Sequence, residues 1–124
     1  MVGLDVTHQA LMTPAHAERL AAAGRAGRLV ADLYAFYARF HERHYGWHGA
    51  PVHDAVAVAH VIDPGLLSTR HCGVLVDTGP EPSRGRTHVD LRGTTGWEPN
   101  CHAAVAIDAP GFLELLITRI AALG

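Results

Sequence analysis

With 124 residues, of which 48% are hydrophobic and 18% charged, the chain is expected to form one domain with one core, which excludes a disordered polypeptide. The formal net charge is −2 and the ten basic side chains, all arginines, are scattered along the sequence, which excludes the basic patch of a nucleic-acid-binding protein. Cys72 and Cys101 form no C-x-x-C motif, so neither a disulfide framework nor a thiolate zinc site is indicated.

The N-terminal segment has neither the pattern of a signal peptide nor an apolar run of about 18 residues, so a cytoplasmic protein without membrane contact is expected. The alternation of Val2, Leu4 and Val6 predicts a first strand. Thr13 and Pro14 then predict a helix start, with threonine as N-cap and proline in the first turn.

The region from 14 to 45 has helical spacing, and Gly24 and Gly27 are expected to divide it into two helices. One apolar stripe of this region consists of Leu29, Leu33, Phe36 and Phe40. After a turn at 46–51 come His53 and Asp54, followed by an apolar helical run over 55–62 that ends at Asp63-Pro64.

The last third of the chain predicts strands over 73–78, 87–92 and 103–107, of which the first two form a hairpin with a long loop. A final helix begins at Asp108 and Pro110. Its expected buried side consists of Phe112, Leu115, Leu116, Ile120 and Leu123. The pattern predicts a single α/β domain over residues 1–124, with a mixed sheet and flanking helices.

The His53-Asp54 pair has two interpretations. Asp54 can cap the following helix while His53 lies on the surface. Alternatively, the carboxylate can be an oxygen ligand for calcium while the adjacent imidazole serves as a general acid in the same pocket. The dipeptide alone does not decide between them.

Ordered sequence blocks favour the second interpretation. They are Gly3-Leu4-Asp5-Val6-Thr7-His8, Gly49-Ala50-Pro51-Val52-His53-Asp54-Ala55, Gly85-Arg86-Thr87-His88-Val89-Asp90, Pro99-Asn100 and Ala104-Val105-Ala106-Ile107-Asp108. In that order they resemble the inosine-uridine preferring nucleoside hydrolases over nearly the whole chain. The resemblance implies that this is the C-terminal portion of a larger Rossmann-like nucleoside hydrolase domain.

The resemblance also implies roles for individual residues. Asp54 would bind the calcium ion that holds the ribose hydroxyls and the attacking water, and His53 would protonate the leaving base. Tyr37, His41 and Tyr45 are spaced i, i+4, i+8, so they would share a helix face that covers the nucleobase. Ordinary amphipathic packing explains the two tyrosines equally well, with His41 solvated.

Much of the family's site is absent from this sequence. No aspartate-rich D-x-D-x-x-x-D-D stretch is present, nor is the family's middle segment with its ribose-binding glutamate and asparagines. Because calcium needs about six to eight oxygen ligands, Asp54 is expected to bind it only weakly, and the chain alone to catalyse little. The resemblance therefore implies a nucleoside N-ribohydrolase that needs a companion N-terminal chain, with self-association into a homo-oligomer as the other expectation.

Two alternatives remain. The chain can be a catalytically inactive remnant or oligomeric binding module of the same fold. It can also be a histidine-rich metal-binding protein, an interpretation that rests only on its ten histidines. His41 and His44 are three residues apart rather than the four of the zinc protease motif H-E-x-x-H, so that motif fails.

Overall fold

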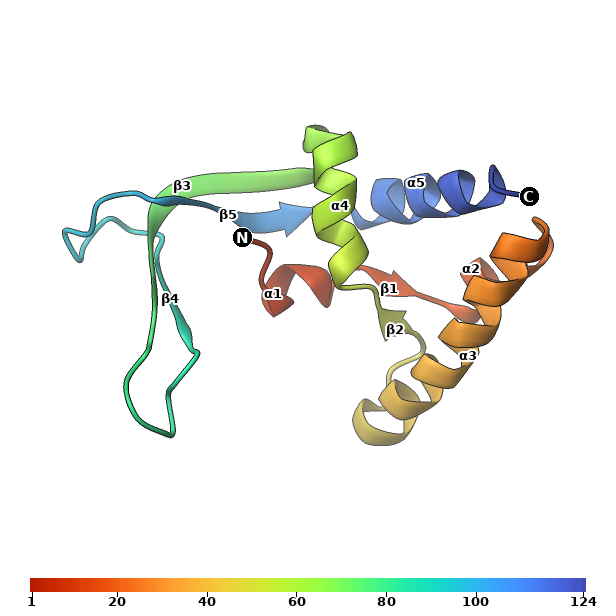
Figure 1. Ribbon diagram of the computed structural model, residues 1–124, viewed down its shortest axis with the longest axis horizontal. Helices are drawn as coiled ribbons and strands as arrows, with labels where there is room; N and C mark the ends of the chain where they lie inside the picture. Colours follow the sequence, from red (N-terminus) through yellow and green to blue (C-terminus); the bar gives the residue numbers. More distant parts are fainter.

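The computed structural model describes residues 1–124 and has an α/β architecture (Figure 1). Its elements in order are α1 (Leu4–Thr7), β1 (Leu11–Met12), α2 (Pro14–Ala21), α3 (Arg25–Tyr45), β2 (Ala50–Pro51), α4 (Asp54–Ile62), the 3-10 helix η1 (Pro64–Leu66), β3 (Leu67–Val76), β4 (Thr87–Asp90), β5 (Cys101–Ile107) and α5 (Ala109–Ala121). The helices α2 and α3 lie at one end of the molecule, while β3, β4 and the start of β5 extend as an arm at the other (Figure 1).

The strands form two small sheets in which every pairing is antiparallel, so the mixed sheet predicted from the sequence is not formed within this chain. One contains β1 and β2, and the other has the order β4-β3-β5. The predicted hairpin is confirmed by the pairing of β3 with β4 from Gly73↔Asp90 to Val76↔Thr87. The strand β3 begins six residues before its predicted start, because the residues from Leu67 to Cys72 pair with β5.

The predicted first strand is wrong, since residues 4–7 form the short helix α1. The amide of Thr7 donates to the carbonyl of Gly3 at 3.1 Å, and the amide of His8 to that of Leu4 at 2.9 Å. In a strand, Leu4 and Val6 would share a face, but here Leu4 is 62% exposed and Val6 is fully buried. Burial of the adjacent pair Val6 and Thr7 therefore decides for a helix.

Both predicted helix starts are confirmed. Pro14 begins α2 after Thr13, whose amide donates to His16 Nδ1 at 3.0 Å. Asp108 caps α5, since its Oδ1 accepts from the amide of Gly111 at 3.0 Å. The division of the 14–45 region falls at Gly24, which has a φ of 115° that side chains other than glycine rarely adopt.

The core is small, with 24 of 124 residues buried, and it lies where α1, α2, α4 and α5 meet. Its largest fully buried side chains include Val6, Leu20, Val56 and Phe112. On α5 the buried residues are Phe112, Leu113 and Ile117, so the expected buried position of Leu123 is wrong. Leu123 lies after the helix and is 75% exposed.

The apolar stripe of α3 faces solvent in this chain. Leu29, Leu33, Phe36 and Phe40 are between 49% and 74% exposed. The buried positions of the helix are instead Gly27, Ala31, Tyr34 and His41. No helix, including the 21-residue α3, has both the length and the apolar character required to cross a membrane.

Candidate active site

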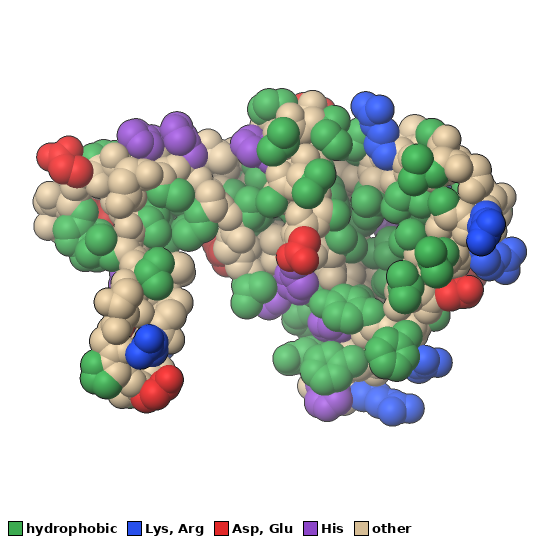
Figure 2. All heavy atoms as spheres, in the orientation of Figure 1, with side chains coloured by type: hydrophobic (Ala, Val, Ile, Leu, Met, Phe, Trp, Pro, Cys, Tyr) green, Lys and Arg blue, Asp and Glu red, His purple; other side chains and the backbone are tan.

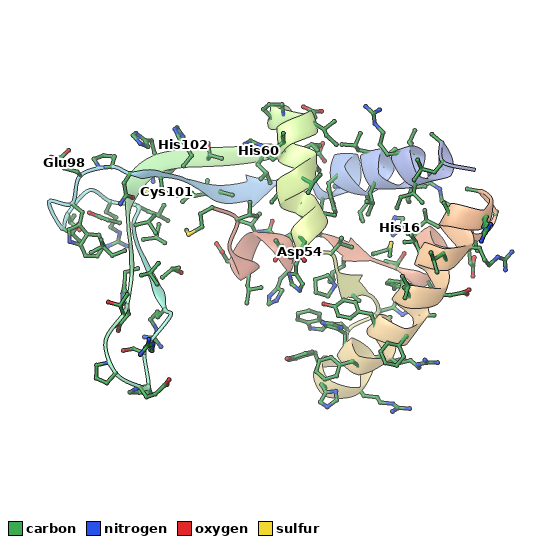
Figure 3. All side chains as sticks on the ribbon, viewed as in Figure 1. His16, Asp54, His60, Glu98, Cys101 and His102 are labelled. Atoms are coloured by element: carbon green, nitrogen blue, oxygen red, sulfur yellow. The ribbon has the colours of Figure 1, made fainter.

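The His53-Asp54 pair lies where β2 leads into α4. The β1–β2 pairing and a 3.0 Å bond from the amide of Val52 to the carbonyl of Ala10 fix the path of the chain just before the pair. His53 is the N-cap residue of α4, and Asp54 is its first residue. Figure 3 shows Asp54 at the end of α4 that lies nearest to α1 and β1.

A cavity of about 450 Å³ adjoins this helix start. Its walls come from β1, α3, β2 and the beginning of α4. The lining residues are Met12, Val30, Leu33, Tyr34, Tyr37, Ala50, Pro51, Val52, His53, Asp54 and Ala55. The mostly apolar wall with a few polar groups is typical of a small-molecule site. Three of the predicted site residues, Tyr37, His53 and Asp54, line it together.

The imidazole of His53 is held by a residue far away in sequence. The hydroxyl of Thr7, which is buried in α1, lies 2.7 Å from His53 Nδ1. Because a hydroxyl can donate or accept, this bond suits both the neutral ring and the imidazolium. It occupies Nδ1, so Nε2 is the nitrogen left to exchange a proton with a ligand.

Sequence reasoning did not give Thr7 a site role. The strand predicted from Val2, Leu4 and Val6 ended just before Thr7, and that pattern indicates no ligand contact. The signal that was available is the first block of the family resemblance, which contains both residues. Only the helical turn of α1 brings the Thr7 hydroxyl to the imidazole of His53.

The other two predicted site residues, His41 and Tyr45, do not line the cavity. His41 is buried among aromatic rings, 4.4 Å from the ring centroid of Tyr37 and 5.8 Å from that of Trp47. Tyr45 is 58% exposed at the end of α3. His8 lies between Trp47 and His53, with centroid distances of 5.2 and 5.6 Å, so an aromatic cluster connects this part of α3 to the His53 ring.

The pKa values of His53 and Tyr37 are shifted in opposite directions. Burial lowers the pKa of His53, with further lowering by His8 and His41 and a smaller opposing effect of Asp54. Burial raises the pKa of the Tyr37 hydroxyl, and the charge of Asp54 adds to this increase. Tyr37 therefore remains a neutral hydrogen-bonding group, and His53 is shifted toward the neutral imidazole.

The carboxylate of Asp54 is exposed and accepts no hydrogen bond within the chain. It does not act as the side-chain cap that the simpler interpretation required, because His53 occupies the N-cap position. An unpaired carboxylate at a helix start is available to a cation. The described residues contain no group of three or more histidine, cysteine, aspartate or glutamate side chains that could hold a metal ion.

Comparison with known sequences settles the family. The family model described as "Inosine-uridine preferring nucleoside hydrolase" matches residues 1–114. The chain belongs to this family. It is 40% identical over 123 residues to the pyrimidine-specific ribonucleoside hydrolase RihA of Enterobacter sp. strain 638, and 38% identical to RihA of Citrobacter koseri. These matches cover 98% of the chain but only 39% of each relative, so the chain spans about two fifths of their length.

Solved structures of nucleoside hydrolases confirm the fold. The purine-preferring ribonucleoside hydrolase from Gardnerella vaginalis superposes with a TM-score of 0.86 at 35% identity, over 99% of this chain and 39% of that one. The plant nucleoside hydrolase PpNRh1 gives 0.84 at 25% identity, over 97% of this chain and 40% of that one. The predicted α/β fold class, a partial nucleoside hydrolase domain, is therefore confirmed.

Proposed function

We propose that this chain is the C-terminal portion of a nucleoside N-ribohydrolase, which hydrolyses the N-glycosidic bond of a ribonucleoside to give the free base and ribose. Family membership and the names of the relatives support the reaction class. The observation that carries the proposal is the arrangement at the start of α4, where His53, bonded to Thr7, and the free carboxylate of Asp54 line one cavity.

In this proposal His53 is the general acid. A purine or pyrimidine anion is a poor leaving group, so protonation of the base during C–N cleavage lowers the barrier. The proton would leave from Nε2 of the imidazolium, and the neutral ring that results keeps its proton on Nδ1. The Thr7 hydroxyl would therefore accept from Nδ1–H both before and after the transfer. Thr7 is thus a positioning residue, and Tyr37 contributes a neutral hydroxyl to the wall of the cavity.

Asp54 would be this chain's contribution to a calcium (Ca²⁺) site, which would bind the ribose hydroxyls and the attacking water. One exposed carboxylate suits an oxygen-preferring cation but supplies only a small part of its ligands. The remaining ligands would come from outside this chain. Tyr45 and His41 would contribute through the aromatic cluster at the end of α3, His41 by holding Tyr37 and Trp47 in place.

The exposed apolar surface favours a companion for this chain. Figure 2 shows hydrophobic side chains gathered over α4 and α3. The exposed residues include Val58, Val61 and Ile62 on α4, and Leu33 and Phe36 on α3. A solvated monomer rarely shows such patches. We propose that they are covered by an N-terminal hydrolase portion, which the relatives contain and this chain does not match, or by a second copy in a homo-oligomer.

The deciding experiment mixes the chain with the separately expressed N-terminal portion of a relative and measures release of ribose from inosine and uridine, with and without calcium. We expect calcium-dependent turnover only in the mixture. Asp54→Ala should abolish it, and His53→Gln should reduce kcat more strongly for substrates with poor leaving groups. Turnover by the chain alone would contradict the need for a companion, and unchanged activity of both variants would contradict the assigned roles.

The role of Thr7 has a readout that does not depend on activity. In Thr7→Val the hydroxyl is replaced by a methyl of similar size, so the His53 ring loses the partner of Nδ1. We expect the imidazole nitrogen NMR shifts of His53 to change, together with a loss of about 1 kcal/mol of stability. Thr7→Ser should restore the shifts; identical spectra for wild type and Thr7→Val would exclude the positioning role.

The alternative is a catalytically inactive oligomeric module of the same fold. Its oligomeric state is supported by the many exposed apolar side chains, whose area is large relative to the small core. It predicts a folded oligomer whose thermal stability is indifferent to calcium, and no turnover in the mixture. The two proposals therefore differ in the calcium response and in the activity of the mixture.

A further inference from the structure

Two histidines outside the candidate active site face each other across the arm. His71 on β3 and His102 on β5 are direct partners in the strand register, and both side chains are exposed. Their rings are stacked, with centroids 4.6 Å apart and an angle of 19° between the planes. Neither residue lines the cavity at His53, and neither has a part in the proposed hydrolase mechanism.

The backbone bonds of β5 define the type of strand pair. The terminal amine of Met1 donates to the carbonyl of His102 at 2.8 Å, and the amide of Ala104 donates to the carbonyl of Met1 at 2.9 Å. These groups of β5 therefore point away from β3. His71 and His102 form a non-hydrogen-bonded pair, in which directly opposite Cα atoms are about 4.5 Å apart and side chains come closest.

We propose that His71 and His102 chelate one divalent transition-metal ion. Imidazole nitrogen is a preferred ligand of Cu²⁺, Ni²⁺ and Zn²⁺, and the order of affinities places Cu²⁺ first. Two imidazoles this close can direct one nitrogen each at the same ion after small side-chain rotations. Their strand register is fixed on both sides of the pair, from Arg70↔Ala103 to Cys72↔Cys101.

The geometry also limits what kind of site this is. No cysteine or carboxylate joins the two histidines to make a group of three, so water molecules fill the other coordination positions. Such a site is open and exchangeable, unlike the closed four-ligand sites of structural zinc. Figure 3 shows His102 on the outer side of the arm, and both histidines are exposed, so the site would be open to solvent.

The test is a Cu²⁺ titration of the purified chain at slightly alkaline pH, followed by calorimetry and electron paramagnetic resonance. We expect one site per chain with two nitrogen ligands in the spectrum. His71→Ala and His102→Ala should each weaken binding by about tenfold or more and remove the two-nitrogen signature, because each leaves a single imidazole. Both residues are exposed, and circular dichroism checks that the variants keep the fold.

His88→Ala is the matched control, because His88 is an exposed histidine of the same sheet that pairs with Leu75 rather than with a histidine. It should bind Cu²⁺ as the wild type does. Wild-type affinity in both His71→Ala and His102→Ala, or an equal loss in His88→Ala, would overturn the proposal. The outcome is independent of the hydrolase proposal, since calcium prefers oxygen ligands and the chain is tested without nucleoside.

Discussion

At the residue scale, a single hydrogen bond between the Thr7 hydroxyl and Nδ1 holds the imidazole of His53. His53 and Asp54 could be chosen from the sequence because they occur together in a block that resembles a known family. Thr7 could not, because its bond to His53 joins positions 46 residues apart and depends on a helix that the local pattern did not predict. His41 was predicted to share a helix face with Tyr37 and Tyr45 that covers the nucleobase, but the fold buries it among aromatic rings, and it does not line the cavity.

Asp90 gives a prediction about pH at this scale. Its pKa is lowered to about 2, chiefly by the hydroxyl of Thr95, which donates to Oδ2 at 2.6 Å, and by the backbone amides of Thr95 and Thr94. Because the folded-state pKa lies below the unfolded value, this carboxylate stabilises the fold above about pH 4. That contribution is lost as the pH falls from about 4 toward 2.

We therefore expect the stability of the wild type in urea to decline over this pH range more steeply than that of Asp90→Asn, which has no carboxylate to protonate. Asp32→Asn is the control, since the exposed carboxylate of Asp32 accepts no hydrogen bond within the chain. Equal pH slopes for the wild type and Asp90→Asn would show that the loop over 90–95 contributes nothing through this charge.

At the scale of elements, helix starts were predictable and packing partners were not. Thr13-Pro14 and Asp108-Pro110 begin helices as expected, because caps depend on a few adjacent residues. The alternation at Val2, Leu4 and Val6 failed because three apolar residues at period two are too few to exclude a single helical turn. Packing of Val6 into the core favoured the helix over the strand at residues 4–7.

Gly27 tests how closely α2 and α3 pack. It is buried inside α3, and a Cβ placed on it would collide with the carbonyl oxygen of Leu20 in α2. Gly27→Ala should improve helix propensity by roughly 0.5–1 kcal/mol but lose about 1–3 kcal/mol to overpacking. We expect net destabilisation in urea denaturation, with Arg28→Ala, at an exposed neighbouring position, close to neutral. A stabilised Gly27→Ala variant would show that the two helices separate easily.

At the scale of the whole molecule, the chain has more exposed apolar surface than a free domain with so small a core is expected to show. The stripe on α3 has the spacing of a buried face, and yet its residues are exposed. The surface of α4 also exposes apolar side chains, since Val61 is 82% exposed. Both faces fit a chain that covers only 39% of the length of its relatives.

Val61→Asp should separate folding from association. Because Val61 is already exposed, the charge should change the unfolding free energy by no more than about 0.5 kcal/mol. It should reduce self-association in sedimentation velocity and weaken binding of the N-terminal portion of a relative. Ala57→Asp places the same charge on another exposed position of α4 and removes little apolar area. If both variants associate equally, the Val61 surface is not an interface.

The sequence by itself determined the family, the helix starts and the hairpin, and it singled out the His53-Asp54 pair as a candidate, because each depends on adjacent residues or on ordered blocks. The tertiary structure decided that residues 4–7 are helical, that Thr7 holds His53, and that His71 stacks on His102. These contacts join segments far apart in sequence, and their formation depends on which apolar side chains pack together. Local patterns of polarity do not specify those partners, whereas the folded chain does.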